Sequence, residues 1–463
     1  MTNPHLTLDQ KIVGDIYTSP EAMDNLYTLC DEFGSRFGGT EGERRATRFL
    51  IAKFEKYGLK NVHKEPIKYT GWTRGEVTFE IVSPIQKSIP CISLPHSPPV
   101  DMQAEIIDME DGAPADFEAH ADQIKGKIVM TTSVFQPKET KRWVHRNEKY
   151  GRSILAGAVG FVFVNHYPGY GPATGGIGDN GKAGLVPGIS LAKEDGEFIK
   201  RLIGRKGKVI ARIKSSDSLA PTTAWNIIGD LPGNQHPEEV ILLGSHYDGH
   251  DISQGAVDPA SGVAAVLEAA RTLAKYAAPL PRSLRFAAWG VEEIGLLGSK
   301  AYVRDHANEL KKIRFYLNMD AAGNEMPKDI NLHAWPDLAS TFARYQKEMS
   351  LEFAIGQTFH DASDHYPFLL KGVVTGGIEA VRKTRGGRGY GHTWYDTLDK
   401  VNPTDVRDAA ALAARLAVRI ASEEDWPVSG REKAAVTELL TIPERKELYD
   451  YNQRIKAFYD KLE

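Results

Sequence analysis

The sequence has little cysteine and no long apolar run. Only two cysteines, Cys30 and Cys91, occur in 463 residues. This excludes a disulfide framework and a metal site built from cysteines, and it suits a reducing compartment. One bridge between these two residues is left open by the sequence alone. No eighteen consecutive apolar residues occur anywhere, so we expect no membrane span.

The chain also has no excess of positive charge, and its first residues do not have the pattern of a secretory leader. Its formal net charge is −4 and its pI is near 6.4, which argues against nucleic acid as a partner. The first residues have no basic start followed by an apolar run, so we expect a cytoplasmic protein. A chain trimmed of its leader would have the same pattern. With 41% hydrophobic and 25% charged residues, the composition is typical of a globular protein of at least two domains.

Strand and helix signals alternate along the chain. Ser19-Pro20-Glu21 is typical of a helix start, and Thr40 with Glu43 has the spacing of a capping box. Beyond residue 222 the pattern is that of a doubly wound α/β fold. Apolar strands are predicted at Glu239–Gly244, Leu284–Trp289, Arg314–Met319, Ile330–Ala334 and Val373–Ile378, and helices at Gly262–Tyr276, Asp337–Met349 and Pro403–Ser422.

The domain organisation predicted from these patterns is discontinuous. Residues 1–100 and 222–430 would form a three-layer α/β/α sandwich with a mixed central sheet. Residues 101–221 would form a smaller inserted α/β domain, with a Gly-rich loop from Tyr167 to Gly188 and a linker at Ser215–Pro221. The alternative is that this stretch extends the main sheet. Residues 431–463 are charged and helical, and would form an arm or a capping helix.

Acids and histidines recur at the ends of the predicted strands, where an α/β sheet binds its ligands. His246 directly follows a strand, and Asp248 is placed to orient it. Taken alone, a single histidine of this kind is more often structural. The same placement is repeated in the residues Asp258, Glu292, Glu293, Asp320 and His392.

Several carboxylates at one edge of a sheet would be costly to bury without a compensating charge. A pair of divalent cations would supply that charge, and a donor set of two histidines with three carboxylates favours zinc. In the Glu292-Glu293 pair, one carboxylate can bind metal while its neighbour serves as a general base. An isolated pair of this kind could equally be a solvated acidic turn.

The chain resembles the co-catalytic zinc exopeptidase family, which includes bacterial leucine aminopeptidases, glutamate carboxypeptidase and carboxypeptidase Q. The resemblance covers most of the chain, from Gly34 to Val401, and includes a segment like the protease-associated insert of that family. The motifs that carry it are, in order, GSHYDG, DPASG, WGVEEIGLLGS, NMDAAG, SDHYPF and GHTWYDTLDKV. The sequence departs from the family pattern at Pro259, where relatives often carry Asp or Asn.

The resemblance implies two zinc ions per chain and a role for each motif residue. His246 and Asp320 would hold one ion, Glu293 and His392 the other, and Asp258 would bridge them. Glu292 would be the general base, and Asp248 would assist as a further catalytic residue. The peptide bond after the bridging aspartate is usually cis in this family, so we expect a cis Asp258-Pro259 bond. The plain alternative is a trans proline that starts the following helix.

The expected substrate is a dipeptide or short peptide hydrolysed at a terminal bond. Candidate substrate-binding residues are Tyr390, Ser363, Asp364, His365 and Arg388, although a packing role for His365 is as consistent with the sequence. The loop Val381–Tyr390 is unusually basic and could bind a substrate carboxylate, or be a solvated turn. Alternatives are an aminopeptidase, an amidohydrolase acting on a small non-peptide amide, and a non-catalytic binding module. We expect no nucleic-acid or membrane partner, and the sequence leaves a homodimer open.

Overall fold

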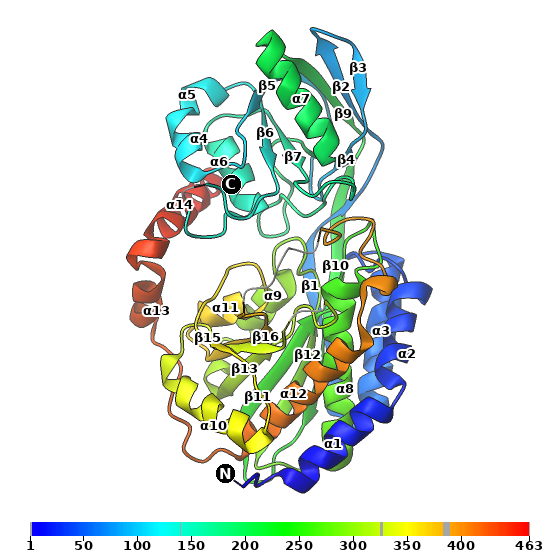
Figure 1. The fold of residues 1–463 in the computed structure, drawn as a ribbon, viewed down its shortest axis with the longest axis vertical. Coiled ribbons are helices and arrows are strands. Elements are labelled where there is room, and N and C mark those ends of the chain that lie inside the picture. The colour runs from blue at the N-terminus through cyan, green and yellow to red at the C-terminus, as the bar shows by residue number, and fades with distance from the viewer. Residues whose placement is uncertain (1, 139, 325–326, 383–388, 463) are drawn as a thin grey trace. The chain divides into compact units, whose positions relative to one another are not determined.

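The computed structural model of the protein describes residues 2–138, 140–324, 327–382 and 389–462 (Figure 1). The chain forms two compact units. The first comprises Met1–Lys68, Thr223–Arg388 and Asp396–Val436, and the second comprises Tyr69–Thr222, Gly389–Tyr395 and Thr437–Glu463. The predicted α/β/α sandwich with an inserted α/β domain is confirmed as the fold class.

The predicted domain bounds, 1–100 with 222–430, 101–221 and 431–463, stay a prediction. Residues 69–100 belong to the second unit because β2 (Val77–Ser83) pairs along its length with β9 (Ile210–Ser215). The end of the chain also belongs to that unit, from Thr437 onwards. A predicted strand signal locates a strand, but it does not say which sheet the strand joins.

The first unit is built on a mixed sheet. From edge to edge the strands are β1 (Lys60–Thr73), β10 (Ser218–Leu231), β12 (Arg282–Trp289), β11 (His236–His246), β13 (Ile313–Asn318), β16 (Thr375–Glu379), β14 (Asp329–Asn331) and β15 (Ile355–Gly356). The central strands β12, β11, β13 and β16 are parallel, while β10 and β14 run antiparallel to their neighbours β12 and β16. Parallel central strands bring their carboxyl ends to one edge of the sheet.

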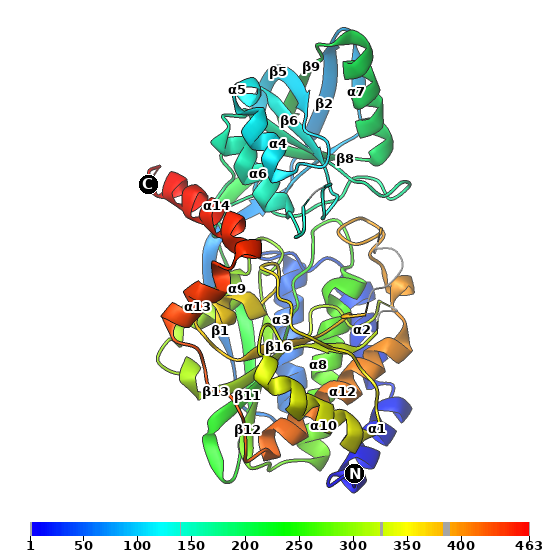
Figure 2. The ribbon, with the colours of Figure 1, turned by 60° about the vertical axis from the view of Figure 1, so that its left-hand side comes forward.

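Helices cover both faces of this sheet, as Figures 1 and 2 show. On one face α8 (Ser261–Tyr276) lies side by side with α12 (Pro403–Ser422), and α1, α2, α3 and α10 pack around this pair. On the other face Tyr302 of α9 and Phe368 of α11 pack against Trp289 and Tyr316. The bounds are α1 (Leu6–Thr18), α2 (Glu21–Tyr27), α3 (Glu41–Lys56), α9 (Leu297–Asp305), α10 (Ala339–Met349) and α11 (His365–Leu369).

The predicted helix starts are only partly as expected. The Ser19 hydroxyl accepts a hydrogen bond from Glu21 N, and α2 begins at Glu21. At α3 the Thr40 hydroxyl accepts from Glu43 N at 3.4 Å, which is half of the predicted capping box. The other half is absent because Thr40 N donates to Phe37 O, while the buried Glu43 carboxyl accepts from Tyr247.

The second unit has its own mixed sheet. Its strand order is β3 (Lys87–Ile89), β2, β9, β5 (Val100–Asp108), β6 (Ile128–Thr132), β7 (Gly160–Val164), β8 (Gly188–Leu191) and β4 (Ile92–Ser93). In one core Phe198 and Ile199 of α7 (Lys193–Lys206) pack against Phe79 and Ile213. In the other Tyr150 of α6 (Arg146–Leu155) packs against Phe161. The short helices α4 (Pro114–Ala119) and α5 (Ala121–Ile124) complete the unit.

The end of the chain is helical, as predicted, with α13 (Lys433–Leu440) and α14 (Pro443–Asp460). Within the second unit, Glu447 of α14 forms ion pairs with Arg142 and Arg152, and Tyr451 lies against Gly151 of α6. These contacts explain why this end of the chain packs as part of that unit.

The structure bears on a disulfide bond and on a membrane-spanning helix. Cys30 and Cys91 are free cysteines, and they belong to different units. Among the residues that the structure describes, no helix is both long and apolar enough to cross a membrane.

Candidate metal centre

Three of the predicted metal ligands and the predicted base Glu292 lie at the carboxyl ends of three neighbouring strands of the first unit, whereas Asp258 lies in the turn Ala256–Ala260. His246 is the last residue of β11, Glu292 and Glu293 follow β12, and Asp320 follows β13. Because β11 runs parallel to and between β12 and β13, these ends meet at one edge. The local sequences contain runs of buried apolar residues, which are typical of strands in a sheet that is covered on both faces.

His246, Asp258 and Asp320 form a group of potential metal ligands whose donor atoms all lie within 4.8 Å of one another. His246 Nε2 is 3.2 Å from Asp320 Oδ1 and 3.4 Å from Asp258 Oδ1. The imidazole is buried, with 1% of His246 exposed. Two carboxylates facing one imidazole nitrogen form a donor set that zinc accepts.

Asp258 is held by a residue that the sequence analysis assigned no role. The Asp396 carboxylate accepts hydrogen bonds from Val257 N at 2.8 Å and from Asp258 N at 3.2 Å. Asp396 is buried and lies in the predicted motif GHTWYDTLDKV. The Asp258-Pro259 peptide bond is cis, so this prediction is confirmed.

Asp248 connects His246 to the turn that carries the glutamates. Its Oδ1 lies 3.6 Å from His246 Nδ1 and accepts a hydrogen bond from Glu292 N at 2.9 Å. Its Oδ2 accepts from Glu293 N at 3.3 Å. Asp248 is buried and therefore orients groups from two strand ends.

The loop between His246 and Asp258 is fixed by the buried guanidinium of Arg36. Arg36 has no exposed surface, and burial lowers its pKa. It donates to five main-chain oxygens, those of Leu29, Gly34, Tyr247, Gln254 and Gly255. These bonds connect the N-terminal segment to the loop that joins two predicted ligands.

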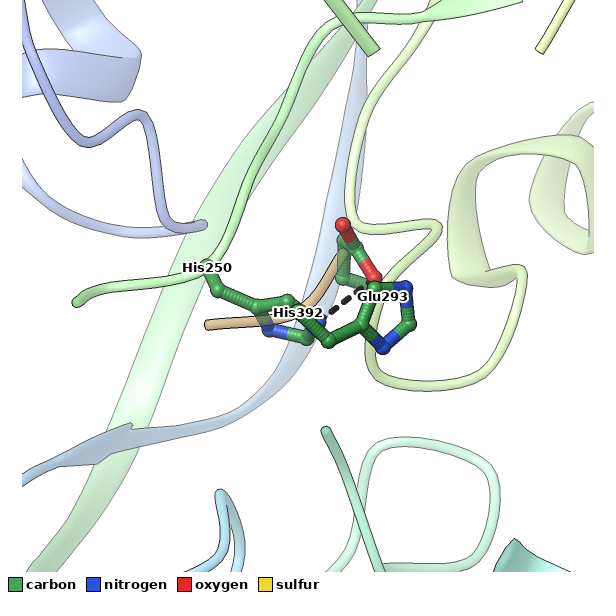
Figure 3. A group of neighbouring side chains, drawn as sticks. All are labelled: His250, Glu293 and His392. Atoms are coloured by element: carbon green, nitrogen blue, oxygen red, sulfur yellow. Dashed lines mark ion pairs between the residues drawn. The ribbon is translucent and has the colours of Figure 1, made fainter. Parts of the chain in front are cut away.

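Glu293 pairs with a histidine that the sequence analysis did not select. His250 Nε2 lies 2.8 Å from Glu293 Oε2, and both residues are buried. Figure 3 marks this ion pair with a dashed line and also draws the side chain of His392. His250 does not directly follow a strand, so the rule that located His246 could not find it. The only sequence feature that pointed to His250 was its position four residues after His246.

His392 and Tyr390 lie in the segment Gly389–Tyr395, which belongs to the second unit. The Gly-rich loop of that unit holds this segment. Thr174 N donates to His392 O at 2.7 Å, and the Tyr170 and Tyr395 rings meet edge to face at 5.9 Å. The ligand role of His392 and the pocket role of Tyr390 remain predictions. Arg388 lies outside the described residues.

Ser363 is the predicted pocket residue that contacts a predicted ligand. Its hydroxyl donates to Asp320 Oδ2 at 2.6 Å and accepts from Asn318 Nδ2 at 2.8 Å. Behind Asn318, the Tyr316 hydroxyl donates to Asn318 Oδ1, and Trp289 Nε1 donates to that hydroxyl, both at 2.7 Å. Because an indole N–H can only donate, every bond in this buried chain has a fixed direction that ends at Asp320.

Asp364 and His365 are both buried. Asp364 Oδ1 accepts from the Ser299 hydroxyl at 2.5 Å, and burial raises the Asp364 pKa to about 7. His365 has no exposed surface, and its Nε2 donates to His360 O at 3.0 Å. Both side chains therefore contact other parts of the protein in this structure.

The electrostatics of the site favour a bound cation. Burial raises the pKa of Glu292 well above its ordinary value, and the charges of Asp320, Glu293 and Asp364 raise it further against the opposing effect of His246. Burial would lower the pKa of His246, but its acidic neighbours, Glu292 first, raise it. So many carboxylates around one imidazole leave an excess of negative charge, which divalent cations would compensate.

Two parts of the chain match known protein families. Residues 226–417 match Peptidase family M28, and residues 98–199 match the PA domain. The first match includes His246, Asp258, Glu292, Glu293 and Asp320. The second lies within the second unit.

Similar proteins fall into two groups of peptidases. Carboxypeptidase Q of Rattus norvegicus is 25% identical over 413 residues, which cover 87% of this chain and 86% of that protein. A probable leucine aminopeptidase 2 of Trichophyton verrucosum is 29% identical over 313 residues, 67% of this chain and 59% of that protein.

Solved structures share the fold. A peptidase M28 precursor from Shewanella amazonensis has a TM-score of 0.75 at 24% identity, covering 92% of this chain and 98% of that one. A zinc aminopeptidase from Bacillus subtilis has a TM-score of 0.67 at 24% identity, covering 87% and 95%.

Proposed function

This chain belongs to peptidase family M28 and carries a PA domain, and we propose that it is a zinc-dependent exopeptidase acting on dipeptides or short peptides. The observation that carries the proposal is the group of His246, Asp258 and Asp320, with ligand atoms within 4.8 Å of one another. This group lies beside a glutamate whose pKa is raised by burial. Metal ligands next to a poised carboxylate are the arrangement that metal-assisted hydrolysis needs.

We propose two zinc ions per chain. His246 and Asp320 would hold the first ion, Glu293 and His392 the second, and Asp258 would bridge them. The fit is supported by the donor types and by the surplus of buried carboxylates around His246. His250, which pairs with Glu293, would be a further donor for the second ion. Zinc in such a site polarises a carbonyl and makes water more acidic.

Glu292 would move the proton in this reaction. A carboxylate with a raised pKa can accept a proton from the attacking water and return it to the nitrogen of the leaving amine. Asp248 holds the main-chain N–H groups of Glu292 and Glu293, so it would fix the position of the base relative to the ligands. The Ser363 hydroxyl would keep Asp320 Oδ2 occupied, which directs Oδ1 towards His246.

The structure bears on the preference for one peptide terminus at Arg382, which lies in the loop that could bind a substrate carboxylate. Arg382 in the basic loop donates to the buried Asp329, with Nη2 2.6 Å from Oδ1. This pairing leaves Arg382 less suited to bind a substrate carboxylate. The other cations of the loop, Lys383, Arg385 and Arg388, lie outside the described residues. We keep a dipeptidase of the carboxypeptidase Q type as the first candidate, because that relative aligns with most of this chain.

Hydrolysis of dipeptides blocked at one end tests the proposal. A carboxypeptidase or dipeptidase needs the free carboxylate and will not cleave the amidated dipeptide, whereas an aminopeptidase needs the free amine and will not cleave the acetylated one. An acyl-amino acid panel in the same assay reports on the amidohydrolase alternative. Cleavage inside long peptides would exclude an exopeptidase, and activity that persists at full rate in excess chelator would exclude the zinc mechanism.

A further inference from the structure

A second group of potential metal ligands lies in the first unit, made of residues other than those proposed above. His333, His365 and Glu379 each offer a ligand atom, and these atoms all lie within 4.8 Å of one another. Glu379 ends β16, His333 follows the adjacent antiparallel strand β14, and His365 begins α11. Three separate segments of the chain therefore converge on this group.

The tautomer of His365 is determined by its surroundings. Its Nε2 lies 3.0 Å from the carbonyl oxygen of His360, which can only accept, so Nε2 carries the hydrogen. In the neutral ring Nδ1 is then a lone pair, and it has no hydrogen-bond partner among the described residues. A buried acceptor without a donor destabilises the folded state.

His333 and Glu379 present donors to the same place. His333 Nε2 is 3.0 Å from Glu379 Oε1, and its Nδ1 is 3.1 Å from the Thr375 hydroxyl. The His333 and His365 rings are stacked, with centroids 3.9 Å apart. The Glu379 carboxylate contacts His333 through Oε1. Its other oxygen accepts from Asn331 at 2.9 Å.

We propose that His333, His365 and Glu379 bind a divalent cation of the zinc type, in addition to the ions of the proposed active site. Two imidazole nitrogens and one carboxylate are a donor set that zinc commonly takes. The cation would give the buried His365 Nδ1 a partner. Second-shell hydrogen bonds of the kind that orient metal ligands are already in place: His333 Nδ1 bonds to the Thr375 hydroxyl, His365 Nε2 donates to His360 O, and Asn331 donates to Glu379.

A simpler arrangement accounts for only part of this geometry. A protonated His333 would form an ion pair with Glu379 without any metal. That arrangement leaves His365 Nδ1 unpaired and stacks a charged ring directly on it. A cation satisfies all three side chains at once.

The position of this group suggests what the cation does. It would join the ends of β14 and β16 to the start of α11. The segment before α11 contains Ser363, which donates to Asp320. A cation at His365 would thus hold in place the segment that positions a proposed ligand of the active site, so its role would be structural.

Counting ions in matched variants tests this inference. The purified chain and its variants are stripped with chelator, reloaded with zinc, dialysed and subjected to elemental analysis. His365→Gln and Glu379→Gln should each hold one ion fewer than the wild type. The control is His306→Gln, which breaks a His–Glu ion pair of 2.8 Å with Glu65 in the same unit and should keep the wild-type count. Because only the difference is used, the result does not depend on how many ions the active site holds.

A second variant covers the case in which the substituted chains fail to fold. Asp258→Asn leaves His333, His365 and Glu379 intact while weakening the proposed active-site ions. Titrated with cobalt, this variant should bind one equivalent and develop visible absorption of a histidine-bound ion. Wild-type ion counts in both His365→Gln and Glu379→Gln, or no cobalt bound by Asp258→Asn, would overturn the inference.

Discussion

The Ser363 hydroxyl donates a hydrogen bond of 2.6 Å to Oδ2 of Asp320. The same hydroxyl accepts from Asn318, so its hydrogen is directed to Asp320. This arrangement leaves Asp320 Oδ1 facing His246. A carboxylate fixed in this way presents one defined oxygen to a metal. Because the hydroxyl already orients Asp320, metal binding costs less side-chain conformational entropy.

Ser363→Ala should therefore weaken zinc binding by about 10-fold to 100-fold, the usual effect of losing a partner of a metal ligand. The affinity is measured by competition with a chromogenic chelator. Ser283→Ala is the control, because it removes a hydroxyl that donates to Pro237 O at the opposite end of β12. Equal affinities for wild type and Ser363→Ala would show that Asp320 does not depend on this hydrogen bond.

Glu292→Gln should keep the bound metal and the fold but lower kcat by about 100-fold to 10,000-fold, because an amide cannot accept the proton of the attacking water. Steady-state hydrolysis of a dipeptide and elemental analysis of the same sample give the two readouts. Glu238→Gln, at an exposed position near the start of β11, serves as the control. If the Glu292→Gln variant turns over at the wild-type rate, another group is the base.

Arg36→Lys should lower the free energy of unfolding by about 2–4 kcal/mol, although the charge is conserved. An ammonium has three donors and cannot reach the five carbonyls that Arg36 contacts, so buried acceptors lose their partners. Urea unfolding measures the change. The control Arg48→Lys alters an arginine whose side chain is 65% exposed and should change stability by under about 0.5 kcal/mol. A change that small at position 36 would contradict the predicted role.

Glu21 should make stability depend on pH in the acid range. Burial would raise its pKa, but hydrogen bonds from Lys53 and Tyr57 lower it from 4.5 to about 2. The folded state thus favours the ionised form, which stabilises the protein fully above pH 4.5. This contribution decreases as the pH falls from 4.5 towards 2.

The unfolding midpoint of Glu21→Gln in urea should lie below that of the wild type at pH 7, and the difference should shrink between pH 4.5 and pH 3. Glu55→Gln, at an exposed position on α3, gives the baseline. A difference that stays constant over this pH range would mean that the carboxylate of Glu21 contributes through packing and not through its charge.

Much of the first unit could be predicted from the sequence because its central strands are short, buried and directly followed by polar residues. The predicted strand Leu284–Trp289 is observed as Arg282–Trp289, and the helix Pro403–Ser422 was predicted at its observed bounds. A motif that follows such a strand, like His246, needs only local pattern and the parallel order of the sheet to be placed.

Contacts between segments far apart in the sequence could not be predicted from local patterns. Asp396 binds the main chain at Asp258, and His250 pairs with Glu293. Neither residue follows a strand, so no periodic pattern identifies it. The helix α1 at Leu6–Thr18 was not predicted, and its buried Ile12 and Ile16 are too few to give a strong apolar face.

The five hydrogen bonds of Arg36 mean that the smallest polypeptide able to form the site must include the N-terminal segment that contains Arg36. The match to the peptidase family begins at residue 226, and every proposed metal ligand lies after that point. A proteolytic cut after Thr40 would leave all of those ligands in the sequence. It would nevertheless expose the carbonyls of Tyr247, Gln254 and Gly255 to water and release the loop between His246 and Asp258. The segment that makes the site rigid is therefore separate in the sequence from the segment that carries its chemistry.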